Sequence, residues 1–148
     1  QDFYVIVDKT QNMDMSILAK SERQLLVLFH SDSELGKQCR AQAEASDAKA
    51  LTIDLKETKI TGTEWAEIAE MLGKNVFDLI QQDHPTFKNK YGDTKVSLED
   101  HDAMKVLENH PETLVYPIAI RGEKALQASK TADISKLFKP DTGEIEKK

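Results

Sequence analysis

The stretch 24–45 constrains the fold more strongly than any other part of this sequence. It begins with an apolar run at 25–29, LLVLF. A run of this kind is typical of a strand that is covered on both faces of a sheet. Three good helix N-cap residues follow at 31–33, and the apolar residues after them recur at a spacing of four, at Leu35, Cys39 and Ala43. We therefore expect a buried strand, a short polar turn and a helix.

A second strand is expected at 48–55, AKALTIDL, because alternation and β-branched residues favour extended backbone. A helix of about eleven residues between the two strands favours parallel pairing through a right-handed crossover. The amino end of that helix then lies at the carboxyl end of the first strand. Free N–H groups and the helix dipole stabilise anions at such a place, so the side chains of the turn decide what the chain can do there.

The rest of the chain predicts a helical insert, a hairpin and a last helix. Within the insert, helices are expected at 63–73, capped by Thr63, at 76–80, and at 97–109, capped by Ser97 with Asp100. His84-Pro85 is expected to end the second of these helices, and residues 86–95 are interpreted as a polar loop. Strands at 114–120 (LVYPIAI) and 124–128, a turn at 121–123 and a helix at 131–138 complete the chain.

This order predicts one α/β domain at 24–138, with strands and helices arranged as βαβ, helical insert at about 60–110, and ββα. Residues 1–23 are expected to form an extension that is in part non-native, because Met13 and Met15 are each possible natural starts. Residues 139–148 are polar, so a flexible tail is expected there.

Composition excludes several classes of protein. The chain has 148 residues and a formal net charge of −6, which argues against direct binding of nucleic acid. One cysteine excludes an internal disulfide, and no apolar run approaches the roughly 20 residues of a membrane span. The apolar residues 3–7 lack the basic lead-in of a signal peptide. We therefore expect a cytoplasmic protein without a membrane segment.

Two motifs carry a resemblance to a known family. Residues 29–38 read FHSDSELGKQ, and residues 116–125 read YPIAIRGEKA. Together with the order of elements, they resemble the glutaredoxin-dependent arsenate reductases of the thioredoxin superfamily, a family that also contains the Spx-type transcription regulators. In that family the first motif has the form YNNPRCSxSR, and the second begins RPIVV and continues to a Lys-Ala pair. The resemblance covers roughly 24–138 and implies a thioredoxin-like fold with a four-stranded mixed sheet. It also implies a cis peptide bond before Pro117.

Residue-by-residue transfer of the family motifs implies loss of the catalytic groups. The nucleophilic cysteine falls on Glu34, and the arginine that would hold an oxyanion falls on Tyr116. A carboxylate cannot be oxidised and reduced as a thiolate is, and Glu34 would compete with an anion for the helix N-terminus. The resemblance therefore implies an inactive relative that acts as a binding or regulatory module. Its expected binding cleft is formed by Ser31, Ser33, Glu34, Lys37, Tyr116 and Pro117.

Cys39 is the remaining candidate for redox chemistry. A helix that begins near Ser33 places Cys39 beyond the first turn and on the same face as Leu35 and Ala43, which predicts a buried, unreactive thiol. The alternative is a thiol-dependent oxidoreductase in which Cys39 works with an external thiol.

The sequence also bears on which metals, partners and small molecules the chain binds. The four histidines do not show the ligand spacing of a metal site, so no metal and no cofactor are expected. His84 and His110 precede prolines and are interpreted as helix-end residues. The expected partner is another protein; the Spx resemblance makes RNA polymerase one conceivable partner, on fold alone. A third hypothesis places a neutral or cationic small molecule in the cleft between Glu34 and Tyr116.

Overall fold

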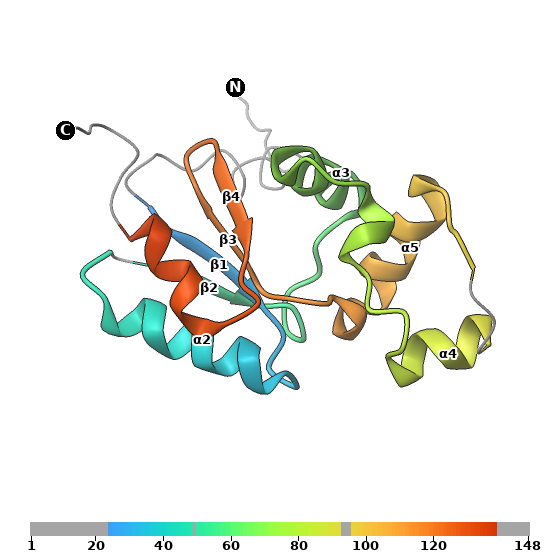
Figure 1. The fold of residues 1–148 in the computed structure, drawn as a ribbon, viewed down its shortest axis with the longest axis horizontal. Helices are drawn as coiled ribbons and strands as arrows, with labels where there is room; N and C mark the ends of the chain where they lie inside the picture. The colour runs from blue at the N-terminus through green and yellow to red at the C-terminus, as the bar shows by residue number, and fades with distance from the viewer. Residues whose placement is uncertain (1–23, 49, 93–95, 139–148) are drawn as a thin grey trace, which may run out of the picture.

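The computed structural model describes residues 24–48, 50–92 and 96–138 (Figure 1). The elements follow in the order β1 (Leu26–Phe29), α2 (Glu34–Ala45), β2 (Leu51–Asp54), α3 (Gly62–Leu72), the 3₁₀ helix η1 (Val76–Leu79), α4 (Pro85–Tyr91), α5 (Asp100–Asn109), the 3₁₀ helix η2 (Pro111–Thr113), β3 (Ile118–Arg121), β4 (Lys124–Gln127) and the 3₁₀ helix η3 (Thr131–Leu137). The extension at 1–23 and the tail at 139–148 lie outside the described residues.

The sheet is four-stranded and mixed, as predicted, with the strand order β2-β1-β3-β4. Strand β1 pairs with β2 in parallel, with Leu26 opposite Leu51. It pairs with β3 antiparallel, with Leu26 opposite Ile120. The hairpin of β3 and β4 completes the sheet. The crossover of β1, α2 and β2 therefore follows the prediction, and β1 is a central strand.

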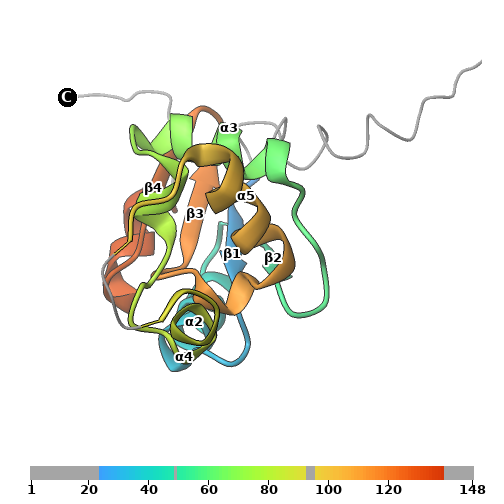
Figure 2. The same ribbon diagram turned by 90° about the vertical axis from the view of Figure 1, so that its right-hand side faces the viewer.

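Two layers of helices explain why the run at 25–29 is apolar throughout. Leu26 and Leu28 face the insert helices, in a buried cluster with Trp65 and Leu107. Leu25 and Val27 face the other side, in a cluster that includes residues of α2 and η3, namely Cys39, Ala43, Ile134 and Leu137. Figure 2, in which the insert faces the viewer, shows α3 and α5 in front of the sheet. Both faces of β1 are thus removed from water, which stabilises the fold through apolar burial.

The third strand is shorter than predicted because its first half leaves the sheet. Pro117 has no N–H to donate, so pairing begins at Ile118. The preceding segment is bonded to the insert instead, since Val115 N–H donates to the carbonyl of Leu79 at 2.8 Å and Gln81 N–H donates to that of Thr113 at 2.7 Å. These bonds tie the insert to the entry of β3.

Three helices of the insert begin at residues other than those predicted. Its first helix is capped by Thr61, which forms a capping box with Glu64, and not by Thr63. Pro85 begins α4 and does not end a helix, because proline is favoured in the first turn, where its missing N–H costs nothing. Glu99 is the N-cap residue of α5, and the Asp100 carboxylate accepts from Val76 N–H at 3.3 Å. The expected helix at 131–138 is of the 3₁₀ type.

Within the described ranges, no helix combines the length and the apolar character that crossing a bilayer requires.

Candidate functional site

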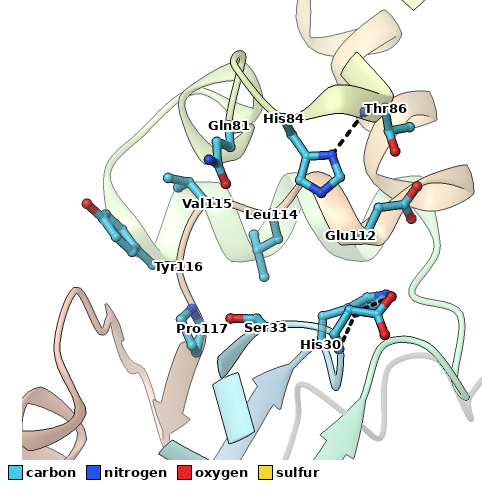
Figure 3. A pocket seen from close by; sticks show the side chains of 11 residues that line it. His30, Ser33, Gln81, His84, Thr86, Glu112, Leu114, Val115, Tyr116 and Pro117 are labelled. Atoms are coloured by element: carbon cyan, nitrogen blue, oxygen red, sulfur yellow. Dashed lines mark hydrogen bonds and ion pairs between the residues drawn. The ribbon is translucent and has the colours of Figure 1, made fainter. Parts of the chain in front are cut away.

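A cavity of about 440 Å³ lies beyond the carboxyl end of β1, between the sheet domain and the insert (Figure 3). We call it the main pocket. Its lower wall comes from the turn after β1 and its upper wall from the insert and the segment that leads into β3. The lining residues are His30, Asp32, Ser33, Gln81, His84, Thr86, Glu112, Leu114, Val115, Tyr116 and Pro117.

The turn that forms the lower wall is held by hydrogen bonds from both sides. Ser33 is the N-cap residue of α2, and its Oγ accepts from Gly36 N–H at 3.0 Å. The N–H of Ser33 in turn donates to the carbonyl of His30 at 2.9 Å. Asp54, at the end of β2, accepts from the N–H groups of Ser31 and Lys56, each at 3.0 Å. Burial raises the pKa of the Asp54 carboxyl, but these hydrogen bonds and the nearby His30 outweigh it, so the pKa lies below its usual value.

Replacing Asp54 with asparagine is expected to lower the free energy of unfolding by about 1 kcal/mol at pH 6, because the N–H groups of the turn lose a charged acceptor. A carboxyl whose pKa is lower in the folded state contributes stability above its ordinary value, about 3.9, and loses it as the pH falls through the folded value. The difference between the wild type and Asp54→Asn should therefore be largest near pH 6 and shrink below about pH 4. Urea unfolding at both pH values measures it. The exposed Asp83→Asn is the control, and an Asp54→Asn difference that stays constant with pH would contradict the assignment.

Two histidines line the main pocket, and each accepts a hydrogen bond at Nδ1. The Nδ1 of His30 accepts from Asp32 N–H, and the Nδ1 of His84 accepts from Thr86 N–H, each at 3.1 Å. A neutral imidazole that accepts at Nδ1 carries its proton on Nε2. In Figure 3 the second nitrogen of His84 points into the pocket. His30 is 8% exposed, and neither Nε2 has a hydrogen-bond partner among the described residues.

The formal charges in the main pocket are negative. Among its lining residues, Asp32 and Glu112 are acidic, and none is lysine or arginine. The exposed Asp32 carboxylate is 3.2 Å from the Lys56 ammonium. The side chain of Glu112 is 27% exposed and lies 3.4 Å from Nδ1 of His110. Small oxyanions would therefore meet carboxylates here without a cationic side chain to hold them.

The structure divides the predicted cleft. Ser33, Tyr116 and Pro117 line the main pocket, as expected for one site. Ser31 and Lys37 instead line a second, more open groove of about 380 Å³ beside Arg40. Glu34 lines neither of them; it is exposed and pairs with Lys37 at 3.6 Å. The physical reason is that successive helix residues point about 100° apart, so only the N-cap residue faces the pocket.

Pro117 also differs from what the resemblance implies. The described residues contain no cis peptide bond, so the bond between Tyr116 and Pro117 is trans. Trans is the intrinsically favoured isomer. Tyr116 is 38% exposed at the rim of the pocket.

Cys39 lies in the core and lines no wall of the main pocket. It is fully buried in the cluster between α2, the sheet and η3, together with Val27 and Ile134. Burial, and to a lesser extent the charge of Asp133, raises the pKa of the thiol to about 11. The burial predicted from the spacing of α2 is thus observed.

Sequence reasoning missed three polar residues that line the pocket. His30, His84 and Glu112 come from three separate segments, and no local motif joins them. His84 is the N-cap residue of α4 and not the helix end that the sequence predicts. Across the described ranges, no group of three or more His, Cys, Asp or Glu side chains is arranged to hold a metal ion.

Comparison with solved structures shows which fold this is. An arsenate reductase from Vibrio cholerae matches with a TM-score of 0.65 at 17% identity, covering 77% of this chain and 97% of its own. A candidate arsenate reductase from Yersinia pestis matches with a TM-score of 0.66 at 14% identity, covering 76% and 98%. An ArsC family related protein from Bacteroides fragilis matches with a TM-score of 0.64 at 12% identity, covering 76% and 96%.

No protein-family model and no curated protein sequence matches the chain. The likeness therefore lies in the fold: the chain has the thioredoxin-like fold of arsenate reductases, with the helical insert between β2 and β3.

Proposed function

We propose that this protein is a binding module that uses the main pocket to hold part of another protein and carries out no thiol chemistry. One observation carries the proposal: the lone cysteine is buried in the core, while the pocket at the carboxyl end of β1 is lined by imidazole, carboxylate and apolar groups. A pocket of this volume with a few polar groups is of the size that binds ligands. A cytoplasmic location is part of the proposal and is tested by cell fractionation.

The arsenate reductase titles of the fold neighbours are not carried over to this chain. Reduction of an oxyanion by a thiol requires a thiolate that reaches the substrate, and Cys39 meets neither condition, being buried with a raised pKa. An arsenate ion in the main pocket would also face Asp32 and Glu112 without a lysine or arginine in the lining. The alternative oxidoreductase hypothesis therefore has less support than binding.

The thiol experiment tests the first half of the proposal. Cys39 in the native protein is expected to react with iodoacetamide at pH 7 at least about 100-fold more slowly than in urea, because a pKa near 11 in place of 9.0 leaves about 100-fold less thiolate. Mass spectrometry of the alkylated protein gives both rates, with Cys39→Ala as the blank. Alkylation of the native protein as fast as in urea would instead support the oxidoreductase hypothesis.

A capture experiment tests the second half. The purified chain is immobilised and exposed to cell extract beside two variants. Tyr116→Ala changes the rim of the main pocket, and Lys37→Ala changes an exposed residue of the second groove. A protein retained by the wild type and by Lys37→Ala, and lost with Tyr116→Ala, supports binding through the pocket. Equal retention by all three would show that the pocket is not the binding site.

A further inference from the structure

We infer that the main pocket binds an α-ammonium group together with its adjacent carbonyl oxygen, as found at the amino terminus of a polypeptide. This inference rests on the proposed function and names the chemistry of its ligand. Three features of the pocket carry it: two imidazole N–H groups without a partner among the described residues, a carboxylate whose side chain is 27% exposed, and a group of apolar side chains at the other end.

The imidazoles require an acceptor from the ligand. The Nε2–H groups of His30 and His84 have no partner among the described residues, and His30 is nine-tenths buried. Leaving such donors unpaired in a filled pocket costs free energy, since water can no longer reach them. The Nδ1 atoms are already occupied by backbone N–H groups, so the rings cannot act as acceptors by changing tautomer without losing those bonds. A ligand oxygen satisfies them.

The carboxylate requires a cationic donor. Glu112 contacts Nδ1 of His110 at 3.4 Å but has no lysine or arginine partner among the described residues, whereas Asp32 already has Lys56. Figure 3 places Glu112 beside His84 on the same wall. A ligand that pairs with both the imidazole N–H groups and the Glu112 carboxylate therefore carries a positively charged donor next to an oxygen acceptor. An α-ammonium and the carbonyl of the same residue have this arrangement.

The other end of the main pocket carries most of its apolar side chains, with Ser33 and Gln81 beside them (Figure 3). Leu114, Val115 and Pro117 line it, and Tyr116 forms the rim. In Figure 3 the side chain of Leu114 points between the two walls. This end fits an apolar first side chain, and the open rim leaves room for the chain that follows it. The net charge of +1 on an amino terminus complements Glu112 better than the net zero charge of a free amino acid.

Matched small probes test each feature in turn. Leucinamide carries the ammonium, the carbonyl and the apolar chain. N-acetyl-leucinamide lacks the ammonium, isoamylamine lacks the carbonyl, and leucine has a carboxylate in place of the amide. Each is titrated at pH 7 while the side-chain nitrogens of His30 and His84 are followed by NMR. We expect leucinamide to shift both rings and to bind on the order of tenfold more tightly than either truncated probe. Equal binding of N-acetyl-leucinamide or isoamylamine would overturn the inference.

A peptide arm identifies the source of the amino group. Leucyl-glycyl-glycinamide is expected to bind at least as tightly as leucinamide, because the rim of the pocket is open. Binding of leucine without binding of this tripeptide amide would overturn the assignment to a polypeptide.

Two variants and a control locate the contacts. Glu112→Gln is expected to weaken leucinamide on the order of tenfold or more, because a charged acceptor is lost. His84→Asn keeps a good N-cap residue for α4 but removes the Nε2 donor, and it should weaken leucinamide more than isoamylamine. Glu34→Gln removes an exposed carboxylate outside the pocket and should change neither. Unchanged affinity in Glu112→Gln, with the fold intact by circular dichroism, contradicts the inference.

Failure of the inference and failure of the proposed function are distinguishable. If N-acetyl-leucinamide or phosphate shifts His30 and His84 as strongly as leucinamide, the pocket is a binding site for a different ligand class and only the inference fails. If no probe shifts either ring and native Cys39 is alkylated rapidly, the proposed function fails as well.

Discussion

Replacing Trp65 with alanine is expected to lower the free energy of unfolding by about 3–5 kcal/mol, the usual cost of removing a buried aromatic side chain. Trp65 is fully buried on α3, in the cluster that joins the insert to one face of the sheet. Helix α3 packs against both α5 and β4, so a cavity here weakens the attachment of the insert as well as its core. The main pocket, whose upper wall belongs to the insert, should be loosened too.

Urea unfolding followed by circular dichroism measures the effect, and the midpoint of thermal unfolding should fall by about 10 °C or more. Trp65→Phe is the matched variant. It should cost much less, because it keeps most of the volume and removes an indole N–H that is buried without a hydrogen-bond partner among the described residues. Leu51→Ala, at a half-exposed site, is the surface control and should cost under about 1 kcal/mol. A loss in Trp65→Ala no larger than that of Leu51→Ala would contradict the packing described here.

Replacing Gly36 with alanine is expected to destabilise the protein by about 2–3 kcal/mol, although the same change in a helix usually stabilises by about 1 kcal/mol. A Cβ atom at Gly36 would lie 2.8 Å from the carbonyl oxygen of His30 and 3.3 Å from the Cβ of Ser33. The nearest of these atoms belongs to the backbone, so no side-chain rotation relieves the contact. The amino end of α2 must move away from the turn, and His30 moves with it.

Gly62→Ala provides a matched control in the first turn of α3. Its Cβ would lie 3.3 Å from the Cβ of Met104 on α5, and a shift of a few tenths of an ångström between the two helices relieves that contact, so the change should stay within about 1 kcal/mol. Chemical denaturation compares the two variants, and the NMR shift of the His30 side chain reports on the turn. Gly36→Ala with unchanged stability and an unchanged His30 signal would show that the approach of α2 to His30 is not tight.

The sequence predicted the fold well where local pattern and tertiary packing require the same residues. The run at 25–29 predicted a doubly covered strand, and Leu26 and Leu25 do face opposite cores. The length between β1 and β2 predicted a parallel crossover, which is what forms. The prediction for Pro85 is wrong because a proline can either end one helix or begin the next. In the structure Pro85 begins α4, and this helix buries Phe87 against the core of the insert.

The candidate site was only half predicted. Ser33, Tyr116 and Pro117 were expected in one cleft and lie in one pocket, because they belong to the two motifs that meet at the end of β1. Glu34 was expected with them and is not, since one further residue of helix turns its side chain away. His84 could not be placed, because its distance from β1 depends on how the insert folds back.

The sequence by itself determined the order of the strands, the helix between the first two of them, the cover of the first strand on both faces, and the burial of Cys39, but it predicted a polar loop where α4 forms. These features follow from the spacing of apolar residues and from the lengths of the connecting segments. Both depend on residues that are close in the sequence, so they can be recognised without the structure. Only the tertiary structure decided that His30, His84 and Glu112 face one pocket. Their meeting depends on hydrogen bonds between the insert and the segment before β3, from Val115 to Leu79 and from Gln81 to Thr113, and such long-range pairings leave no local pattern.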